Sequence, residues 1–125
     1  MPFTIAAFVT RKPEISPADF EAAYESTHIP ALKEAVGDAY PQTVARYYVR
    51  RAKSDPQGLT PLSFTGSEET FGYDLVSHLT FADEPAALEF QKKYAEAKES
   101  LAANVAGFAQ LENFRVIAFK DAITN

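Results

Sequence analysis

Three residues near the start of the sequence lie at helical spacing and carry side chains that could do chemistry. Phe20, Tyr24 and His28 are four positions apart, so they fall on one face of a helix. An imidazole with an ordinary pKa of about 6.5 can take up or release a proton near neutral pH. A tyrosine one turn earlier can donate a hydrogen bond to a carbonyl or phenolate oxygen. The spacing is therefore compatible with a general acid–base site in which His28 is the base or acid and Tyr24 is the donor.

His28 also has a structural interpretation. We expect the helix to end close to this residue, and a protonated histidine near a helix C-terminus is stabilised by the helix dipole. Such a histidine would cap the helix and take no part in a reaction. The residues alone favour this structural role and leave the catalytic one open.

The second histidine, His78, shares one face of a predicted strand with Asp74. Because a strand rises about 3.3 Å per residue, the two side chains lie about 13 Å apart and do not bond each other. If their shared face points toward the helices, both could meet the ligand that His28 contacts, and either could position or protonate a leaving group. The alternative is that both are polar strand residues satisfied by neighbouring strands or by solvent.

The sequence is rich in aromatic residues, with 10 Phe and 6 Tyr. Aromatic side chains more often form a core, but this excess also indicates a planar, apolar ligand. Tyr47 and Tyr48 are adjacent in a predicted strand, so they point to opposite faces and only one of them can face a pocket. The residues predicted to contact a substrate are Phe20, Tyr47, Tyr48, Phe64, Phe71, Tyr94 and Phe108.

Two helices are predicted to position these side chains. Ser16 is a natural N-cap and Pro17 suits a first helical turn, so the first helix starts there and runs to about His28. Pro30 disfavours helical geometry at the residue before it, which predicts a kink, with further helix over residues 31–36 up to Gly37. The second helix opens at residues 83–85 and should end before Gly107.

Four strands are predicted, over residues 3–10, 43–52, 73–81 and 113–119. The first is read as a strand rather than a signal peptide, because no basic residues precede its apolar run. The order β-α-β-β-α-β predicts a single α+β domain over residues 1–125 with a ferredoxin-like fold: a four-stranded antiparallel sheet with two helices on one face. Apolar residues on both faces of three strands predict a homodimer in which two sheets pack into a barrel.

Residues 53–72 contain several proline and glycine residues and show neither helical nor alternating periodicity. A connection of this length is more often a lid or a binding loop than a plain link.

Composition argues against several classes of function. The net charge is −5 and no basic patch is present, so nucleic acid is not an expected partner. No stretch approaches the roughly 20 apolar residues of a membrane-spanning helix. The chain has no cysteine, its two histidines lie on separate elements, and no dinucleotide or phosphate-loop motif is present. We therefore expect a cytoplasmic protein with no metal and no cofactor.

The N-terminal part of the chain, FVTRKPEISPADFEAAYESTHIP, resembles the opening motif of EthD-domain proteins in the dimeric α+β barrel superfamily. The later segments Tyr73-Asp74 and Leu79-Thr80-Phe81 resemble the third strand of that family, which often carries Glu where this chain has His78. The positions that match the N-terminal motif are Arg11, Lys12, Pro13, Ser16, Pro17, Phe20, Tyr24, His28 and Pro30.

The likeness is strongest to small fungal EthD-domain enzymes of aromatic polyketide pathways. These are described as dehydratases or decarboxylases of anthrone and anthraquinone precursors. The resemblance shifts the balance toward a catalytic His28 and implies a cofactor-independent lyase acting on a small aromatic substrate. Two alternatives stay open: a cofactorless monooxygenase or cyclase using the same pocket, and a non-catalytic module that binds aromatic ligands.

Overall fold

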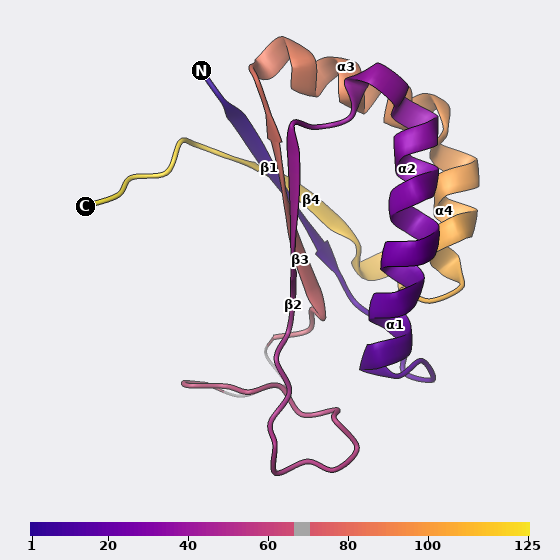
Figure 1. The fold of residues 1–125 in the computed structure, drawn as a ribbon, viewed down its shortest axis with the longest axis vertical. Coiled ribbons are helices and arrows are strands. Elements are labelled where there is room, and N and C mark those ends of the chain that lie inside the picture. The colour runs from indigo at the N-terminus through magenta and orange to yellow at the C-terminus, as the bar shows by residue number, and fades with distance from the viewer. Residues whose placement is uncertain (67–70) are drawn as a thin grey trace.

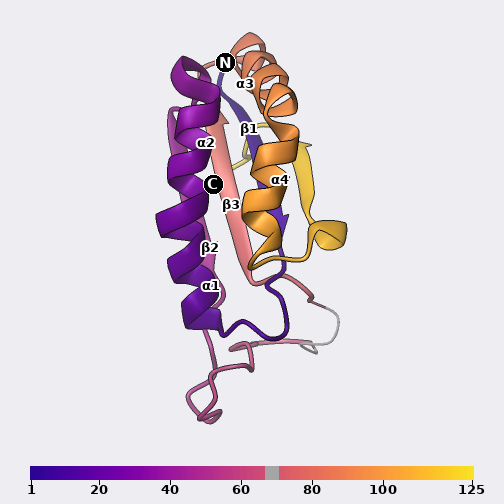
Figure 2. The same ribbon diagram turned by 90° about the vertical axis from the view of Figure 1, so that its right-hand side faces the viewer.

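The computed structural model describes residues 1–66 and 71–125. Its sheet contains four antiparallel strands in the order β2-β3-β1-β4, with the helices packed on one face (Figures 1 and 2). This arrangement confirms the predicted ferredoxin-like α+β fold. The strands are β1 (Phe3–Val9), β2 (Thr43–Tyr48), β3 (Leu75–Phe81) and β4 (Arg115–Phe119).

The first helical segment runs without interruption from residue 17 to residue 36. It consists of α1 (Pro17–Ala23), a π-helical turn η1 (Tyr24–His28) and α2 (Ile29–Val36). The start follows the sequence prediction, because the Ser16 side chain accepts a hydrogen bond of 3.1 Å from the Asp19 amide. A short 3₁₀ turn, η2 (Gly37–Ala39), follows.

The kink predicted at the residue before Pro30 is wrong, because the helix is irregular over Tyr24–His28 instead. Ile29 keeps α-helical angles (φ −59°, ψ −47°), and its amide bonds the Tyr24 carbonyl five residues earlier. The wider π-helical turn absorbs the irregularity that the proline introduces, one turn before the proline itself. Such turns are rare and often occur at functional sites.

The second helical segment has a break that the sequence did not predict. It comprises α3 (Glu84–Glu96) and α4 (Lys98–Ala106), separated by Ala97 with φ −103° and ψ 12°. Its start matches the prediction, since the Asp83 side chain caps the Ala86 amide at 2.9 Å. It also ends before Gly107, as expected, and a 3₁₀ turn, η4 (Leu111–Asn113), leads into β4.

Strand alternation determines which side chains the helices cover. On β3 the side chains of Leu75, Ser77, Leu79 and Phe81 are buried, whereas His78 is exposed on the opposite, open face of the sheet. The open face also carries exposed apolar residues of the edge strands, namely Tyr47, Ile117 and Phe119. Among residues 1–66 and 71–125, none of the helices has the length and apolar character needed to cross a membrane.

The connection between β2 and β3 is organised by its own polar side chains. The carboxylate of Asp55 accepts hydrogen bonds from the Thr60 hydroxyl and from the amides of Gln57, Leu59 and Thr60. These bonds, with the Thr60 hydroxyl as the largest cause, lower the pKa of Asp55 to about 2. The described part of this loop extends beyond the end of the sheet (Figure 1). Residues 67–70 of the predicted lid or binding loop lie outside the described residues.

Substitution of Gly37 should test the backbone geometry at the end of α2. Gly37 has φ 53° and ψ −124°, a conformation that side-chain-bearing residues rarely adopt, although a Cβ there would meet open space. We expect Gly37→Ala to lower the free energy of unfolding by about 1–3 kcal/mol through backbone strain alone. Urea unfolding followed by circular dichroism measures the change.

Gly107→Ala is the matched control, because Gly107 has φ −69° and a Cβ there would make only ordinary contact. That variant should be as stable as the wild type or more stable by up to about 1 kcal/mol. Equal stability of the two variants would contradict the assigned geometry at residue 37.

Candidate functional site

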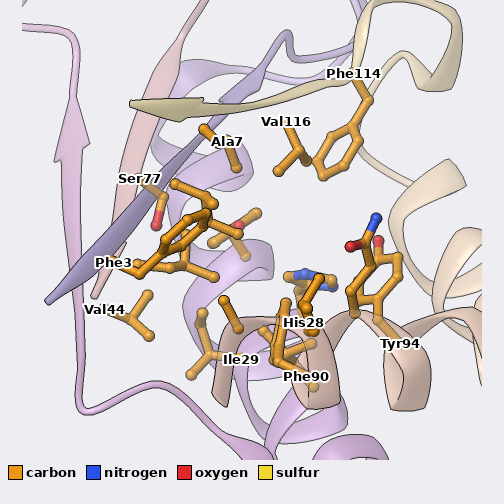
Figure 3. A pocket seen from close by; sticks show the side chains of 18 residues that line it. Phe3, Ala7, His28, Ile29, Val44, Ser77, Phe90, Tyr94, Phe114 and Val116 are labelled. Carbon is orange, nitrogen blue, oxygen red and sulfur yellow. The ribbon is translucent and has the colours of Figure 1, made fainter. Parts of the chain in front are cut away.

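A cavity of about 340 Å³ lies between the helices and the sheet. Side chains of all four strands form its sheet side, and side chains from η1, α2 and α3 form its helical side (Figure 3). Aromatic rings contribute much of the wall, from Phe3, Tyr24, Phe90, Tyr94 and Phe114. A mostly apolar cavity of this volume is of the size that holds a small organic ligand.

Five of the described residues that line the cavity carry polar groups: Tyr24, His28, Ser77, Gln91 and Tyr94. A few polar groups in an otherwise apolar wall are the usual means of orienting a ligand. Two of the five, Tyr24 and His28, are the residues that the helical spacing singled out.

His28 is buried, with a relative exposure of 2%, and lies at the end of the π-helical turn. Its Nδ1 is 3.3 Å from Oδ1 of Asn104 on α4. Because an amide oxygen only accepts, Nδ1 carries the hydrogen in this contact and Nε2 is left with the basic lone pair. Burial lowers the pKa of His28, and the hydrogen bond to Asn104 opposes part of that effect. The imidazole is therefore neutral at neutral pH, the form that can accept a proton.

Tyr24 stacks beside this imidazole, with ring centroids 4.8 Å apart and planes inclined by 46°. Burial raises the pKa of Tyr24 well above its ordinary value, and burial likewise raises the pKa of Tyr94 on α3. Both side chains consequently remain phenols that can donate a hydrogen bond. An anionic oxygen formed inside the cavity would be stabilised by such donors.

An ion pair ties the π-helical turn to β2. The Glu25 carboxylate accepts hydrogen bonds from Arg46 Nε at 2.8 Å and from the Tyr48 hydroxyl at 2.6 Å. These bonds lower the pKa of Glu25, with the Arg46 bond as the largest cause. Glu25 follows Tyr24 directly, so the pair holds η1, and with it Tyr24 and His28, against the sheet.

Asp74 lies outside the cavity, so the prediction that it shares a pocket with His28 is wrong. Its carboxylate accepts a hydrogen bond from the Arg11 amide at 2.9 Å and pairs with Arg51 Nη2 at 2.6 Å. Arg11 Nε lies 3.2 Å from the same carboxylate. Arg11 and Asp74 are both positions at which the sequence resembles EthD-domain proteins. Their ion pair joins the start of β3 to the segment that follows β1.

His78 also lies outside the cavity. Its predicted role required its strand face to point toward the helices, and the structure shows that this face points away from them. Since Ser77 and Leu79 point toward the helices, strand alternation turns His78 to the open face. There its ring packs against Tyr47, with centroids 5.2 Å apart. Neither His78 nor Asp74 meets a ligand held beside His28.

The predicted substrate-contacting residues fall into three groups. Tyr94 lines the cavity. Three others, Phe20, Tyr48 and Phe108, do not line it but surround Tyr24, with ring centroids 6.2, 6.4 and 6.2 Å from its own. The remaining residues lie elsewhere: Tyr47 on the open face, and Phe64 and Phe71 exposed in the connection between β2 and β3.

Three residues that the sequence analysis passed over belong to this site: Ser77, Gln91 and Asn104. Ser77 carried a detectable signal, because it is the one polar residue in the alternating set Leu75, Ser77, Leu79 and Phe81. Gln91 is three residues before Tyr94, so it shares a helix face with a predicted contact residue. Asn104 had no comparable signal, since its pairing with His28 joins residues 76 positions apart.

A family model described as the EthD domain matches residues 12–112. A search of curated proteins found no match. Among solved structures, the chain is similar to an EthD-like protein from Ralstonia eutropha at 9% identity and a TM-score of 0.58, over 94% of this chain and 87% of that one.

Two further solved structures are similar to this chain. An ethyl tert-butyl ether D family protein from Bacillus halodurans has 15% identity and a TM-score of 0.56, over 98% of this chain and 100% of that one. An Arabidopsis thaliana protein has 14% identity and a TM-score of 0.57, over 98% of both chains. At these identities the structural likeness shows the fold alone.

Replacement of Asp74 should separate a structural role from a catalytic one. Asp74→Asn leaves Arg11 and Arg51 close together without their shared counter-charge, and all three side chains are at most 16% exposed. We expect the free energy of unfolding to fall by about 3 kcal/mol, as when one partner of a buried ion pair is removed. Urea unfolding measures the loss.

Asp121→Asn, a change in the exposed C-terminal tail, serves as the control and should leave stability unchanged. An Asp74→Asn protein with wild-type stability and impaired turnover would show instead that this carboxylate serves the reaction.

Proposed function

Because the chain belongs to the EthD domain family, we propose that it is a cofactor-independent lyase acting on a flat aromatic substrate of the polyketide type. The reaction would be the loss of water from a β-hydroxy ketone or the loss of CO₂ from a β-keto acid. The observation that supports this proposal best is a buried, neutral imidazole lining an apolar cavity beside protonated phenols.

The dehydration follows from the properties of these groups. Nε2 of His28 removes a proton from the carbon between the carbonyl and the hydroxyl-bearing carbon, and the electron pair forms an enolate. Tyr24 or Tyr94 donates a hydrogen bond to the enolate oxygen, where the negative charge collects. The enolate then expels the β-hydroxyl group, which leaves as water with the proton that the imidazolium returns. His28 ends in its starting form, so no external oxidant or reductant is needed.

The low polarity of the cavity supports the same assignment. A neutral base next to apolar walls is more easily desolvated than a charged one when it meets the substrate. The aromatic product of the elimination is flat, and the rings of Phe3, Phe90 and Phe114 offer it apolar surface. Decarboxylation would place negative charge on the same enolate oxygen and use the same phenol donors.

Family resemblance and the open face of the sheet together support a homodimer. Tyr47, Ile117 and Phe119 are 58%, 48% and 50% exposed on that face, which the helices do not cover. A second copy of the chain placed sheet to sheet would bury these side chains and build the barrel that the resemblance implies.

His28→Gln should test the proposed base while preserving side-chain volume and a donor for Asn104. On 3-hydroxy-1-tetralone, which becomes 1-naphthol when it loses water, we expect kcat/KM to fall by about 10²-fold or more. Naphthol fluorescence follows the reaction, and an oxygen electrode run in parallel would reveal a monooxygenase through oxygen uptake. His78→Gln, on the open face, is the control and should keep wild-type turnover.

The wild-type rate should depend on pH through the same group. Because burial lowers the pKa of His28, kcat/KM should be constant above about pH 6.5 and fall at lower pH. The folded state should also lose stability relative to His28→Gln as pH falls below about 6.5, where the unfolded wild type binds the proton first. Full turnover by His28→Gln would remove the assignment of His28 as the base, and unchanged ligand with tight binding would indicate a non-catalytic binding module.

Ile117→Lys should test the homodimer. A charge on the open face would oppose burial against a second copy, so the variant should elute as a monomer while the wild type elutes as a dimer. Size-exclusion chromatography with light scattering gives both masses. Leu111→Lys, an exposed apolar residue in η4 away from the sheet face, should remain dimeric. A wild-type monomer at micromolar concentration would contradict the proposal.

A further inference from the structure

The hydroxyl of Ser77 is a buried polar group without a hydrogen-bond partner among the described residues. Ser77 is 1% exposed and lines the cavity from β3, the second strand of the sheet counted from the β2 edge. A buried hydroxyl that lacks a partner is unfavourable, and native proteins rarely retain one without a reason. A group of this kind that faces a ligand cavity is available to a ligand.

The surroundings of Ser77 make it distinct within the cavity. The sheet residues that line the cavity with it, including Ala7, Val44 and Leu79, are apolar. Its cross-strand partners are Ala7 on β1, which has no polar side-chain group, and Arg46 on β2, whose guanidinium pairs with Glu25 and does not line the cavity. Along the sheet side of the cavity the Ser77 hydroxyl is therefore the one side-chain hydrogen-bonding group among the described residues.

The other polar groups of the cavity come from the helical side. Tyr24 and His28 belong to η1, while Gln91 and Tyr94 belong to α3. In Figure 3, Ser77 and Tyr94 lie on opposite sides of the cavity and His28 lies between them. A ligand that satisfies both sides needs two polar atoms separated by an apolar body.

We infer that Ser77 determines substrate specificity by bonding a second oxygen of the ligand, remote from the oxygen that the phenols hold. The inference rests on the proposal that the cavity binds a flat aromatic substrate. It narrows that substrate class to ring compounds with an oxygen function on two opposite edges, one held by the helical side and one by Ser77. A compound with a single oxygen would leave one side of the cavity unsatisfied.

Two naphthols provide the binding test, because 2,6-dihydroxynaphthalene carries an oxygen on opposite edges and 2-naphthol carries only one. Titration followed by naphthol fluorescence gives a Kd for each probe. The wild type should bind the diol about three- to tenfold more tightly, the gain expected from one neutral hydrogen bond. In Ser77→Ala this preference for the diol should disappear. The substitution and the loss of the second naphthol hydroxyl each remove the same hydrogen bond, so their effects are not additive.

Thr80→Val is the matched control. Thr80 is on the same strand but on the opposite face, so this variant loses a hydroxyl without reaching the cavity and should keep the preference for the diol. Thermal unfolding of the ligand-free proteins adds an independent readout. Ser77→Ala should unfold at the wild-type temperature or slightly above it, since it removes a buried hydroxyl that the fold does not satisfy.

The outcomes separate this inference from the proposed reaction. A diol preference that survives in Ser77→Ala, or that is absent from the wild type, would overturn the role of Ser77. A Ser77→Ala protein that loses stability and keeps the preference would show that the hydroxyl serves the fold. Failure of both naphthols to bind at 1 mM would overturn the inferred substrate class. If the preference depends on Ser77 but 3-hydroxy-1-tetralone is not converted, the lyase proposal fails while the role of Ser77 stands.

Discussion

The site depends on keeping an imidazole uncharged inside an apolar layer. Burial lowers the pKa of His28, and a single contact with Asn104 leaves Nε2 as the basic nitrogen. Both conditions come from tertiary packing, because α4 supplies the amide and the sheet supplies the apolar surroundings. The π-helical turn and the Glu25–Arg46 ion pair then hold the histidine in this position. Without that packing, His28 would be an ordinary solvated residue at neutral pH.

Local signals in the sequence were sufficient for most of the fold. The Ser16 cap, the apolar strands and the end of α2 at Gly37 depend on interactions within a few residues, which the sequence shows directly. The location of His28 and Tyr24 on an inward helix face followed from spacing for the same reason. The break at Ala97 and the π-helical turn were not predictable, since alanine fits either conformation and the turn depends on how the helix meets the sheet.

The errors about Asp74 and His78 have one physical origin. Strand alternation predicted that Asp74 and His78 share a face, but alternation alone leaves undecided which face of a strand the helices cover. The face was set by Leu75, Leu79 and Phe81, whose burial stabilises the core and turns His78 outward. Ser77 was overlooked because its one signal, a polar residue in an otherwise apolar alternating set, indicates no particular chemistry. The inference about Ser77 required the structure, which places its hydroxyl against the cavity without a hydrogen-bond partner among the residues that the structure describes.

The break at Ala97 places two kinds of site residue on two separate short helices. Helix α3 carries Gln91 and Tyr94, which line the cavity. Helix α4 carries Asn104, which orients the imidazole. A change in the tilt or sequence of α3 can therefore enlarge or reshape the cavity without disturbing the tautomer of the imidazole. A scaffold built in this way can acquire new ligands during evolution while the histidine that we propose as the base keeps its position.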